Sequence, residues 1–395
     1  MKNIEDRLFK LKEKIKHDEP ISIMILGLGS VGMFLLDYLI SYNWDVSVNV
    51  VVVGRNLNKM EMDVNIVKVA SLIRGQNKCN ISIQSNCDFN NVDEIAKCIA
   101  KYCPDLIVNS SRVYPGLKYG SISWSNLRAY GIWTPLAVGF IRNIMQAYER
   151  VNSDAIVINT SYSDTVIAWI KTSDNPYPDF GSGNLNHLVP RIKLAISEMY
   201  NIEDFWNIKI TLATSHFHDV VISKEGHTEN VEPLLSVSYK DDIINVDTKK
   251  LYTKCKISMP TDSKRNMMNA SSNFEIINSI VEAVTTNSKQ VFHSPGAFGY
   301  IGGYPICIDG TKEFPIAFVD ESIFSLNDMI NVNKKSIALD GVESIKNGTL
   351  TFTDVLINKV KAVFNVELAK YVPFDEIDKT SHTIIDSIIK PNLKE

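Results

Sequence analysis

The chain has 395 residues, 45% of them hydrophobic and 22% charged, with a formal net charge of -4. A chain of this length can bury substantial cores and is expected to divide into two domains. The small negative charge gives no reason to expect nucleic acid or an anionic membrane as a partner, and no apolar run approaches the roughly 18 residues that a membrane span needs. The amino terminus also lacks an apolar signal region. We therefore expect a cytoplasmic protein in which the six cysteines are reduced thiols.

The first predicted element is an amphipathic helix over residues 4–18. Ile4, Leu8 and Leu11 recur at helical spacing among charged residues. Because the polar face mixes acids with bases, packing on the rest of the protein or on a second subunit is favoured over membrane binding. We interpret residues 1–19 as a cap and expect a homodimer or homotetramer, since this apolar stripe needs a surface to cover.

A glycine-rich turn follows the predicted strand 21–26 and precedes the predicted helix 33–40. It reads Gly27-Leu28-Gly29-Ser30-Val31-Gly32. In such a turn the first glycine makes the bend, the second lets the backbone approach a pyrophosphate, and the third lets helix pack on strand. The phosphates of the ligand then lie at the positive end of the helix. This motif predicts a dinucleotide-binding site.

The end of the second predicted strand, residues 46–53, indicates which dinucleotide binds. A site for NAD commonly has a carboxylate at this strand tip, where it accepts hydrogen bonds from ribose hydroxyls. Here the strand is followed by Gly54-Arg55-Asn56-Leu57-Asn58-Lys59, with no acid. Arg55 can bind a ribose 2′-phosphate through paired, charge-assisted bonds, Lys59 can add a point charge, and Asn56 favours the turn. The predicted cofactor is NADP rather than NAD.

Helices and strands alternate from there to about residue 175. The pattern predicts helices over 59–74, 92–102 and 134–150, and strands over 80–84, 105–109 and 155–159. This rhythm is typical of a Rossmann-type doubly wound parallel sheet, which binds ligands at the carboxyl ends of its strands. We assign residues 20–175 to this α/β dinucleotide-binding domain.

The pattern changes near residue 175, where Pro176, Pro178 and Gly181 interrupt the rhythm. Residues 176–395 are assigned to an α+β domain for substrate binding, catalysis and oligomerisation. Its predicted elements are a helix over 189–200, a strand-rich segment over 208–259, a polar loop over 260–272, a helix over 273–286, strands from 306 onward with a hairpin at 346–348, and helices over 353–364 and 381–389.

A histidine, a proline and an arginine in this domain form a recognisable pattern. His227 is followed six places later by Pro233, and Arg191 lies in an upstream glycine-led segment. Together with the glycine turn, they resemble the lactate and malate dehydrogenase superfamily over roughly residues 20–365. The resemblance implies that His227 is the catalytic acid and base, that Arg191 binds a substrate carboxylate, and that Asn159 holds the cofactor carboxamide and the substrate oxygen.

The chain departs from that family at two of these positions. The family's aspartate that orients the histidine lies three residues before the arginine, where this chain has Leu188. Asn186, His187 and Glu229 are the alternatives for the orienting role. The family's proline after the strand-end asparagine is also absent, because Thr160 stands there.

The loop after strand 105–109 differs as well. It reads Ser110-Ser111-Arg112 where the family has a glycine-rich turn. By the resemblance, Ser110 and Ser111 lie beside the cofactor. The same comparison makes Arg112 the arginine that polarises the substrate carbonyl, with Arg128 as the competing residue.

These residues predict an NADP-dependent oxidoreductase that transfers a hydride between the nicotinamide and a small 2-oxo or 2-hydroxy acid-like substrate. The hydroxyl proton must leave as the hydride leaves, and a histidine that titrates near neutral pH suits that exchange. An arginine can hold a carboxylate through two parallel bonds. Three alternatives stay open: an opine-type or imino-acid reductase, a metal-dependent glycosidase-like enzyme, and a non-catalytic NADP-binding sensor.

A second pair of histidines occurs in His216-Phe217-His218. If this segment is a strand, its residues i and i+2 share one face, so both imidazoles can reach one metal ion. The sequence offers no evident third ligand. We therefore expect no metal here, with one histidine buried and the other exposed.

Overall fold

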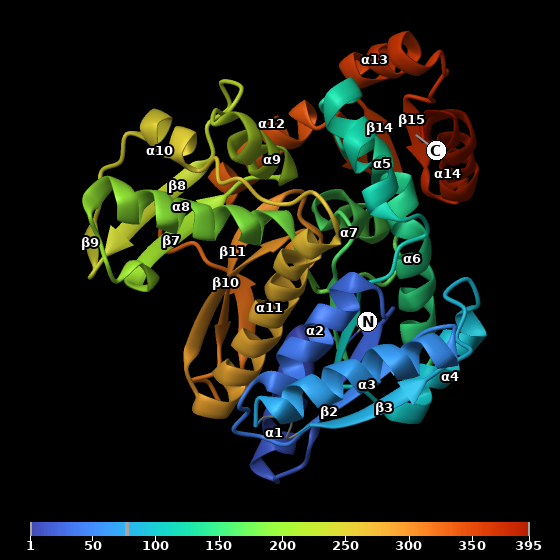
Figure 1. Ribbon diagram of the computed structural model, residues 1–395, viewed down its shortest axis with the longest axis vertical. Helices are drawn as coiled ribbons and strands as arrows, with labels where there is room; N and C mark the ends of the chain where they lie inside the picture. The colour runs from blue at the N-terminus through green and yellow to red at the C-terminus, as the bar shows by residue number, and fades with distance from the viewer. Residues whose placement is uncertain (1, 76–78, 394–395) are drawn as a thin grey trace.

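The largest sheet of the protein is parallel and has six strands in the order β3-β2-β1-β4-β5-β6. The computed structural model describes residues 2–75 and 79–393 (Figure 1). The strands are β1 (Ile21–Leu26), β2 (Val48–Val53), β3 (Asn80–Gln84), β4 (Leu106–Asn109), β5 (Ile156–Asn159) and β6 (Phe180–Gly181). The order reverses between β1 and β4, which is the point where such sheets bind ligands. The predicted Rossmann-type sheet is confirmed.

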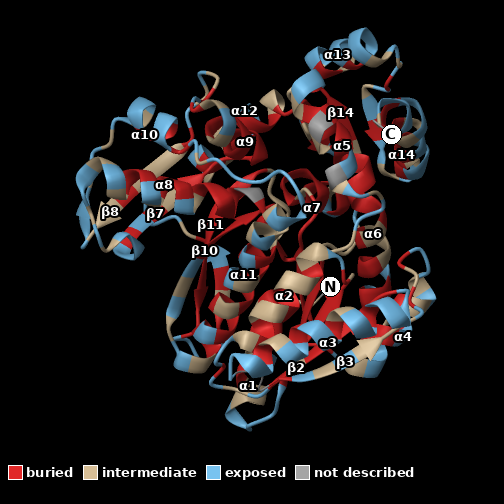
Figure 2. Ribbon diagram, viewed as in Figure 1, coloured by how far each residue is buried: buried red, intermediate tan, exposed pale blue. Residues whose placement is uncertain are grey.

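This sheet is buried on both faces, as Figure 2 shows for its central strands. Met24 and Leu26 of β1 point into one hydrophobic core, whereas Ile23 and Ile25 point into the other. A continuous apolar strand is the pattern of a parallel sheet covered on both sides. The covering helices include α2 (Ser30–Ser41), α3 (Leu57–Ile73), α4 (Val92–Tyr102) and α6 (Thr134–Arg150).

Helix α1 (Ile4–Lys16) packs within the same chain rather than on a second subunit. Its stripe contacts β1, β5, α11 (Asn266–Thr286) and β12 (Ile316–Val319). Arg7 donates to Asp179 Oδ2 at 2.7 Å, and both side chains are buried. The stripe is therefore covered, and the inference of an oligomer from this helix was wrong. The homodimer or homotetramer itself stays a prediction.

The rest of the chain forms three small antiparallel sheets with helices, which confirms the predicted α+β character. The sheets comprise β7 (Ile208–Ala213), β8 (Leu234–Tyr239) and β9 (Asp242–Ile243); β10 (Lys289–Pro295), β11 (Gly303–Asp309) and β12; and β13 (Val342–Lys346), β14 (Thr349–Phe352) and β15 (Tyr371–Pro373). The hairpin at 346–348 is the turn between β13 and β14. The proposed boundaries at 19 and 175 stay predictions.

Two predicted segments differ from the structure. Residues 208–259 contain helix α9 (His216–Glu225) between β7 and β8 and helix α10 (Thr248–Lys254) after β9, and α11 begins at Asn266 inside the predicted polar loop. The first residues of α11 are mostly polar and show little helical periodicity, so the sequence did not predict a helix there. Tertiary packing of α11 on α2 stabilises the helix instead. Further helices are α5 (Gly116–Ile122), α7 (Ser163–Thr172), α8 (Asn184–Tyr200), α12 (Leu326–Leu339), α13 (Asp354–Phe364) and α14 (Ile377–Ile384).

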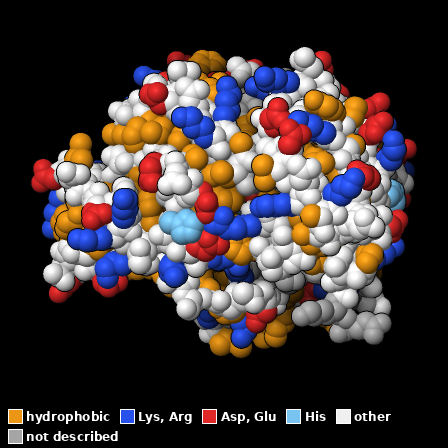
Figure 3. Space-filling model, turned by 90° about the horizontal axis from the view of Figure 1, so that it is seen from above, with side chains coloured by type: hydrophobic (Ala, Val, Ile, Leu, Met, Phe, Trp, Pro, Cys, Tyr) orange, Lys and Arg blue, Asp and Glu red, His pale blue; other side chains and the backbone are white. Residues whose placement is uncertain are grey.

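These later elements lie on two sides of the sheet's upper end. In Figure 1, α8, β7 and α10 lie at one side of the molecule and α13 and α14 at the other, both above β2 and β3. Figure 3 shows acidic and basic side chains interspersed over the face seen from above. None of the helices within residues 2–75 and 79–393 combines the length and apolar character that crossing a membrane requires.

Candidate functional site

A cavity of about 810 Å³ runs from the glycine turn to the first turn of α9. Its walls come from both parts of the chain, at the carboxyl ends of β1, β2, β4 and β5. Its lining includes Gly27, Leu28, Gly29, Ser30, Val31, Arg55, Asn56, Lys59, Asp88, Ser110, Ser111, Arg112, Tyr130, Trp133, Thr160, Tyr162, Asp164, Ser182, Gly183, His216, Asn266 and Asn269. This is the position at which doubly wound sheets bind ligands.

The glycine turn has the geometry that a pyrophosphate needs. Gly27 adopts a φ of +97°, which favours glycine. A side chain at Gly29 would meet nothing within 4 Å, so the backbone there faces open space. A Cβ at Gly32 would lie 2.2 Å from the carbonyl oxygen of Gly27, so this glycine serves packing and does not line the cavity. These three positions fit a dinucleotide at the start of α2.

Three residues after β2 line the same cavity. Asn56 caps α3 by accepting from the Lys59 amide at 3.0 Å. The Lys59 ammonium lies 2.6 Å from Asp63, whereas Arg55 is exposed and, among the described residues, has no ion pair. Asp88 also lines this part of the cavity, but its Oδ1 accepts from both nitrogens of Asn90. Arg55 therefore offers a free cation at the tip of β2.

The loops after β4 and β5 form the middle of the cavity. Ser110 donates to the Gly27 carbonyl at 2.6 Å, and Ser111 and Arg112 line the cavity beside it. Asn159 is fully buried and does not line it. Its Nδ2 donates to the Ser161 carbonyl and the Ser163 hydroxyl, both at 3.1 Å. Asn159 therefore holds the turn that follows β5.

A histidine and an aspartate form a buried pair at the inner end of the cavity. His216 Nδ1 lies 3.0 Å from Oδ2 of Asp340, which ends α12. Tyr162 Oη donates to the same oxygen at 2.5 Å, and the Tyr130 amide donates to Oδ1 at 2.7 Å. Burial disfavours the charged imidazole, but the nearby carboxylates, with Asp340 foremost, together outweigh burial, so the pKa of His216 is raised. This arrangement fixes the ring and favours Nδ1 as the donor to Asp340.

A second carboxylate faces the same histidine. Asp164, in the first turn of α7, lines the cavity and is 3% exposed. Its Oδ1 accepts from the backbone amide of His216 at 2.9 Å. Burial raises the pKa of Asp164 to about 6, although the nearby His216 opposes that rise.

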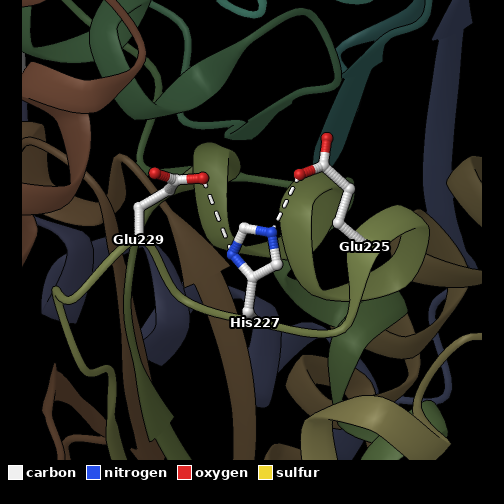
Figure 4. A group of neighbouring side chains, drawn as sticks. All are labelled: Glu225, His227 and Glu229. Atoms are coloured by element: carbon white, nitrogen blue, oxygen red, sulfur yellow. Dashed lines mark ion pairs between the residues drawn. The ribbon is translucent and has the colours of Figure 1, made fainter.

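The structure places His227 outside this cavity, and Figure 4 shows its ring between Glu225 and Glu229. Its ring is 49% exposed, with Nε2 at 2.9 Å from Glu225 and Nδ1 at 3.6 Å from Glu229. Arg128 pairs with both glutamates. The spacing to Pro233 does not bring His227 to the cavity, because His227 lies beyond the carboxyl end of α9, whose first residue, His216, lines the cavity. Arg128 is likewise absent from the described lining.

Arg191 is also engaged elsewhere. It is buried, and its Nη1 donates to the carbonyls of Cys255 and Ile257, each at 3.1 Å. Of the alternatives for the orienting residue, Asn186 binds Glu275 and the His293 carbonyl. Glu229 lies in the surface cluster with His227. Within the part of the chain that the structure describes, Arg191 therefore holds the backbone at Cys255 and Ile257.

His187 lies beside another buried acid. Its Nδ1 is 4.0 Å from Asp219 Oδ2, and burial lowers the pKa of this histidine to about 3. Among the described residues, neither ring nitrogen of His187 and neither carboxylate oxygen of Asp219 has a hydrogen-bond partner. Burial also raises the pKa of Asp219 to about 6. His187 therefore does not orient His216, and Asp219 is a buried acid without a donor.

The two histidines of the 216–218 segment lie on a helix rather than a strand and both are buried, so the expectation that one of them is exposed was wrong. Successive helical positions differ by about 100°, which separates residues i and i+2. His218 is fully buried, with Nδ1 2.5 Å from Ser336 Oγ and Nε2 2.5 Å from the Val231 carbonyl. Among the described residues, a cluster of three ligand atoms within 4.8 Å occurs only at Glu225, His227 and Glu229, where Arg128 already pairs with both acids.

A local signal for His216 was present in the sequence. The apolar strand Ile208–Ala213 is followed by Thr214 and Ser215, and Ser215 is the N-cap of α9. His216 stands three residues after the end of this strand, and residues just beyond strand ends often line binding sites. Asp340 had no comparable signal, because only tertiary structure brings it to His216.

Comparisons with known proteins support the fold. No protein-family model and no curated protein sequence matches the chain. Malate dehydrogenase from Salinibacter ruber is similar in structure at 12% identity, with a TM-score of 0.51, over 80% of this chain and 94% of that one. A lactate dehydrogenase enzyme from a Medee basin deep-sea metagenome library has 13% identity and a TM-score of 0.48, over 81% and 96% of the two chains. Minor L-lactate dehydrogenase from Enterococcus mundtii has 13% identity and a TM-score of 0.46, with the same coverage.

The similarity to malate dehydrogenase shows that this chain shares the fold of that protein, with a parallel nucleotide-type sheet followed by antiparallel sheets. The fold implied by the sequence resemblance is thereby confirmed.

Proposed function

We propose that the chain is an NADP-dependent oxidoreductase that transfers a hydride between the nicotinamide and a small 2-oxo or 2-hydroxy acid-like substrate. One observation carries this proposal. A single cavity joins a glycine turn suited to a pyrophosphate to a buried histidine held by a carboxylate. The fold shared with malate dehydrogenase supports the reaction class. The expected cytoplasmic location stays part of the proposal.

The cofactor preference rests on the tip of β2. Arg55 is a free cation there, with Lys59 and Asn56 beside it in the lining. A guanidinium can form paired bonds to a ribose 2′-phosphate, which NAD lacks. These residues, together with the open backbone at Gly29, would hold NADP, which supplies or accepts the hydride when bound.

His216 replaces His227 as the proposed acid and base. Its Nδ1 is held by Asp340, and no described residue is hydrogen-bonded to its Nε2. In the reducing direction the imidazolium donates its Nε2 proton to the substrate oxygen, and in the oxidising direction the neutral ring removes that proton. Asp340 keeps the ring in one tautomer and stabilises its charged form, as a carboxylate partner does for catalytic histidines.

Arg112 is the proposed contact for the charged oxygen of the substrate. It lies on the loop after β4, in the lining between the glycine turn and His216, and Arg191 is bound to backbone carbonyls instead. Asn159 is proposed to position the turn after β5 through Ser161 and Ser163.

Spectrophotometry with NADPH tests this function. The purified protein is incubated with a panel of 2-oxo acids, and NADPH absorbance is followed with and without an added amine. Oxidation that disappears in His216→Asn supports the proposal. Tight NADPH binding with a fully active His216→Asn variant would contradict the assigned acid and base. The sensor alternative predicts binding with no turnover on any substrate, and the glycosidase-like alternative predicts dependence on manganese without net cofactor consumption.

A further inference from the structure

Three buried carboxylates surround His216. Asp164, Asp219 and Asp340 are 3%, 1% and 0% exposed, and all three act electrostatically on this histidine. Buried acids are normally paired with a cation. Within the described residues, no lysine or arginine forms an ion pair with any of the three; Arg191 and Arg265 influence Asp219 only from a longer distance. The inner end of the cavity therefore has more negative than positive groups.

Asp164 is the acid of this group that reaches the cavity. It lines the wall together with His216, and its Oδ1 is bound to the backbone amide of that histidine. Asp340 is occupied by Tyr162, Tyr130 and the His216 ring. No lysine or arginine among the described residues pairs with Asp164, whose carboxylate interacts electrostatically with the His216 ring and reaches the cavity.

The missing positive charge fits an organic cation better than a metal ion. A metal requires several ligand atoms close together, and the described residues provide three such atoms within 4.8 Å only at the surface cluster of Glu225, His227 and Glu229. A nitrogen cation on the substrate needs only one or two carboxylates within hydrogen-bonding distance.

We infer that the substrate reduced at this site is a protonated imine, formed from a 2-oxo acid and an amine, and that Asp164 recognises its nitrogen. The inference rests on the proposed function and names its substrate class. Condensation of the amine with the carbonyl releases one water. The imine carbon then gains hydride from NADPH, which leaves NADP⁺, and the resulting neutral amine takes one proton from His216. The product is a secondary or primary ammonium that Asp164 can still bind.

A pair of isosteric ligands tests the recognition without turnover. Iminodiacetate carries a protonated nitrogen where diglycolate has an ether oxygen, and the two are otherwise alike. We expect the NADPH-saturated protein to bind iminodiacetate at least about tenfold more tightly in titration calorimetry with EDTA present, because a charge-assisted bond forms only with the nitrogen. Asp164→Asn, which keeps a similar shape, should abolish that preference. Glu229→Gln removes an equal charge outside the cavity lining and should keep it.

Activity provides the second arm. NADPH oxidation with pyruvate, glyoxylate or 2-oxoglutarate should require ammonium, methylamine or an amino acid. Amine-independent reduction would overturn the inference and leave the proposed function intact, whereas normal NADPH binding with no oxidation under either condition would count against the proposed function. Equal affinity for the two ligands, or binding of neither, also overturns the inference. The inference is also overturned if Asp164→Asn changes only the ratio of the affinities for NADP⁺ and NADPH, because the carboxylate would then face the oxidised nicotinamide. Thermal unfolding of each variant confirms that it is folded.

Discussion

Replacement of His216 by asparagine should separate the two histidines that compete for the catalytic role. General acid–base catalysis contributes a factor of roughly 10² to 10⁴, which corresponds to about 3–5 kcal/mol of activation free energy. The variant His216→Asn should lose this factor in turnover and keep NADPH affinity, because His216 lies at the far end of the cavity from the glycine turn. Asparagine can still donate to Asp340, so the buried carboxylate keeps a partner.

The matched variant is His227→Asn. The ring of His227 is about half exposed, and its contacts with Glu225 and Glu229 lie at the surface, where such pairs contribute about 0–1 kcal/mol. Because His227 also lies outside the cavity lining, turnover should stay close to that of the wild type. Both variants are assayed under saturating NADPH with the substrate identified by the panel. A large loss in His227→Asn together with near-normal turnover in His216→Asn would refute this assignment.

Further predictions follow from other contacts. Arg55→Ala should reduce the preference for NADPH over NADH by roughly 1–3 kcal/mol, measured as the ratio of dissociation constants, and an unchanged ratio would argue against a 2′-phosphate contact. The pKa of His216 is raised, so reduction should be fast at low pH and fall as pH rises through a pKa above the usual value of about 6.5; Asp340→Asn should move this fall to lower pH, and an unmoved profile would exclude the pair. The raised pKa of Asp219 means that its protonated form favours folding: this contribution to stability is fully present below about pH 4 and is lost as the pH rises through about 6. Asp219→Asn should therefore raise the melting temperature at pH 8, and a lower melting temperature there would contradict this prediction. The predicted homodimer now depends on the exposed apolar side chains of α3, where Ile66 and Ile73 are 61% and 82% exposed; sedimentation should detect a dimer that dissociates on Ile66→Glu, and a monomer in the wild type would end that prediction.

Short sequence patterns were sufficient to predict the strands and the glycine turn of the parallel-sheet half of the molecule. Continuous apolar runs become strands buried on both faces, and Gly27 and Gly32 stand where a backbone bend and a close contact exclude other residues. Arg55 follows a strand whose end is fixed by neighbouring strands on both sides, so its position in the lining was accessible from sequence. Each of these features depends on a few adjacent residues.

The proposed acid and base depends on contacts between residues that are distant in the sequence, and the spacing of residues along the chain did not predict it. His216 and Asp340 are separated by more than a hundred residues, and Asp164 comes from a third element. The interval between His227 and Pro233 carries no such constraint, because a loop of that length can leave a helix in many directions. Helix α9 was missed because its run of β-branched residues, Val220, Val221 and Ile222, also suits a strand, and its hydrophobic stripe is weak. Helix α9 begins with His216 close to the end of β7 and separates that residue from His227.

The position of His216 after β7 is therefore stronger evidence for a catalytic role than the spacing of His227 and Pro233 downstream. The end of β7 is held by its antiparallel pairing with β8, and α9 begins with His216 three residues later, so the position of His216 is restrained on both sides. A residue on the loop that follows α9 lacks both restraints. Because hydride and proton transfer require reacting groups to be held within a fraction of an ångström, chemistry is expected at the restrained position. The same reasoning explains why Asp340, which ends a helix and accepts three hydrogen bonds, can orient His216 where a loop glutamate cannot.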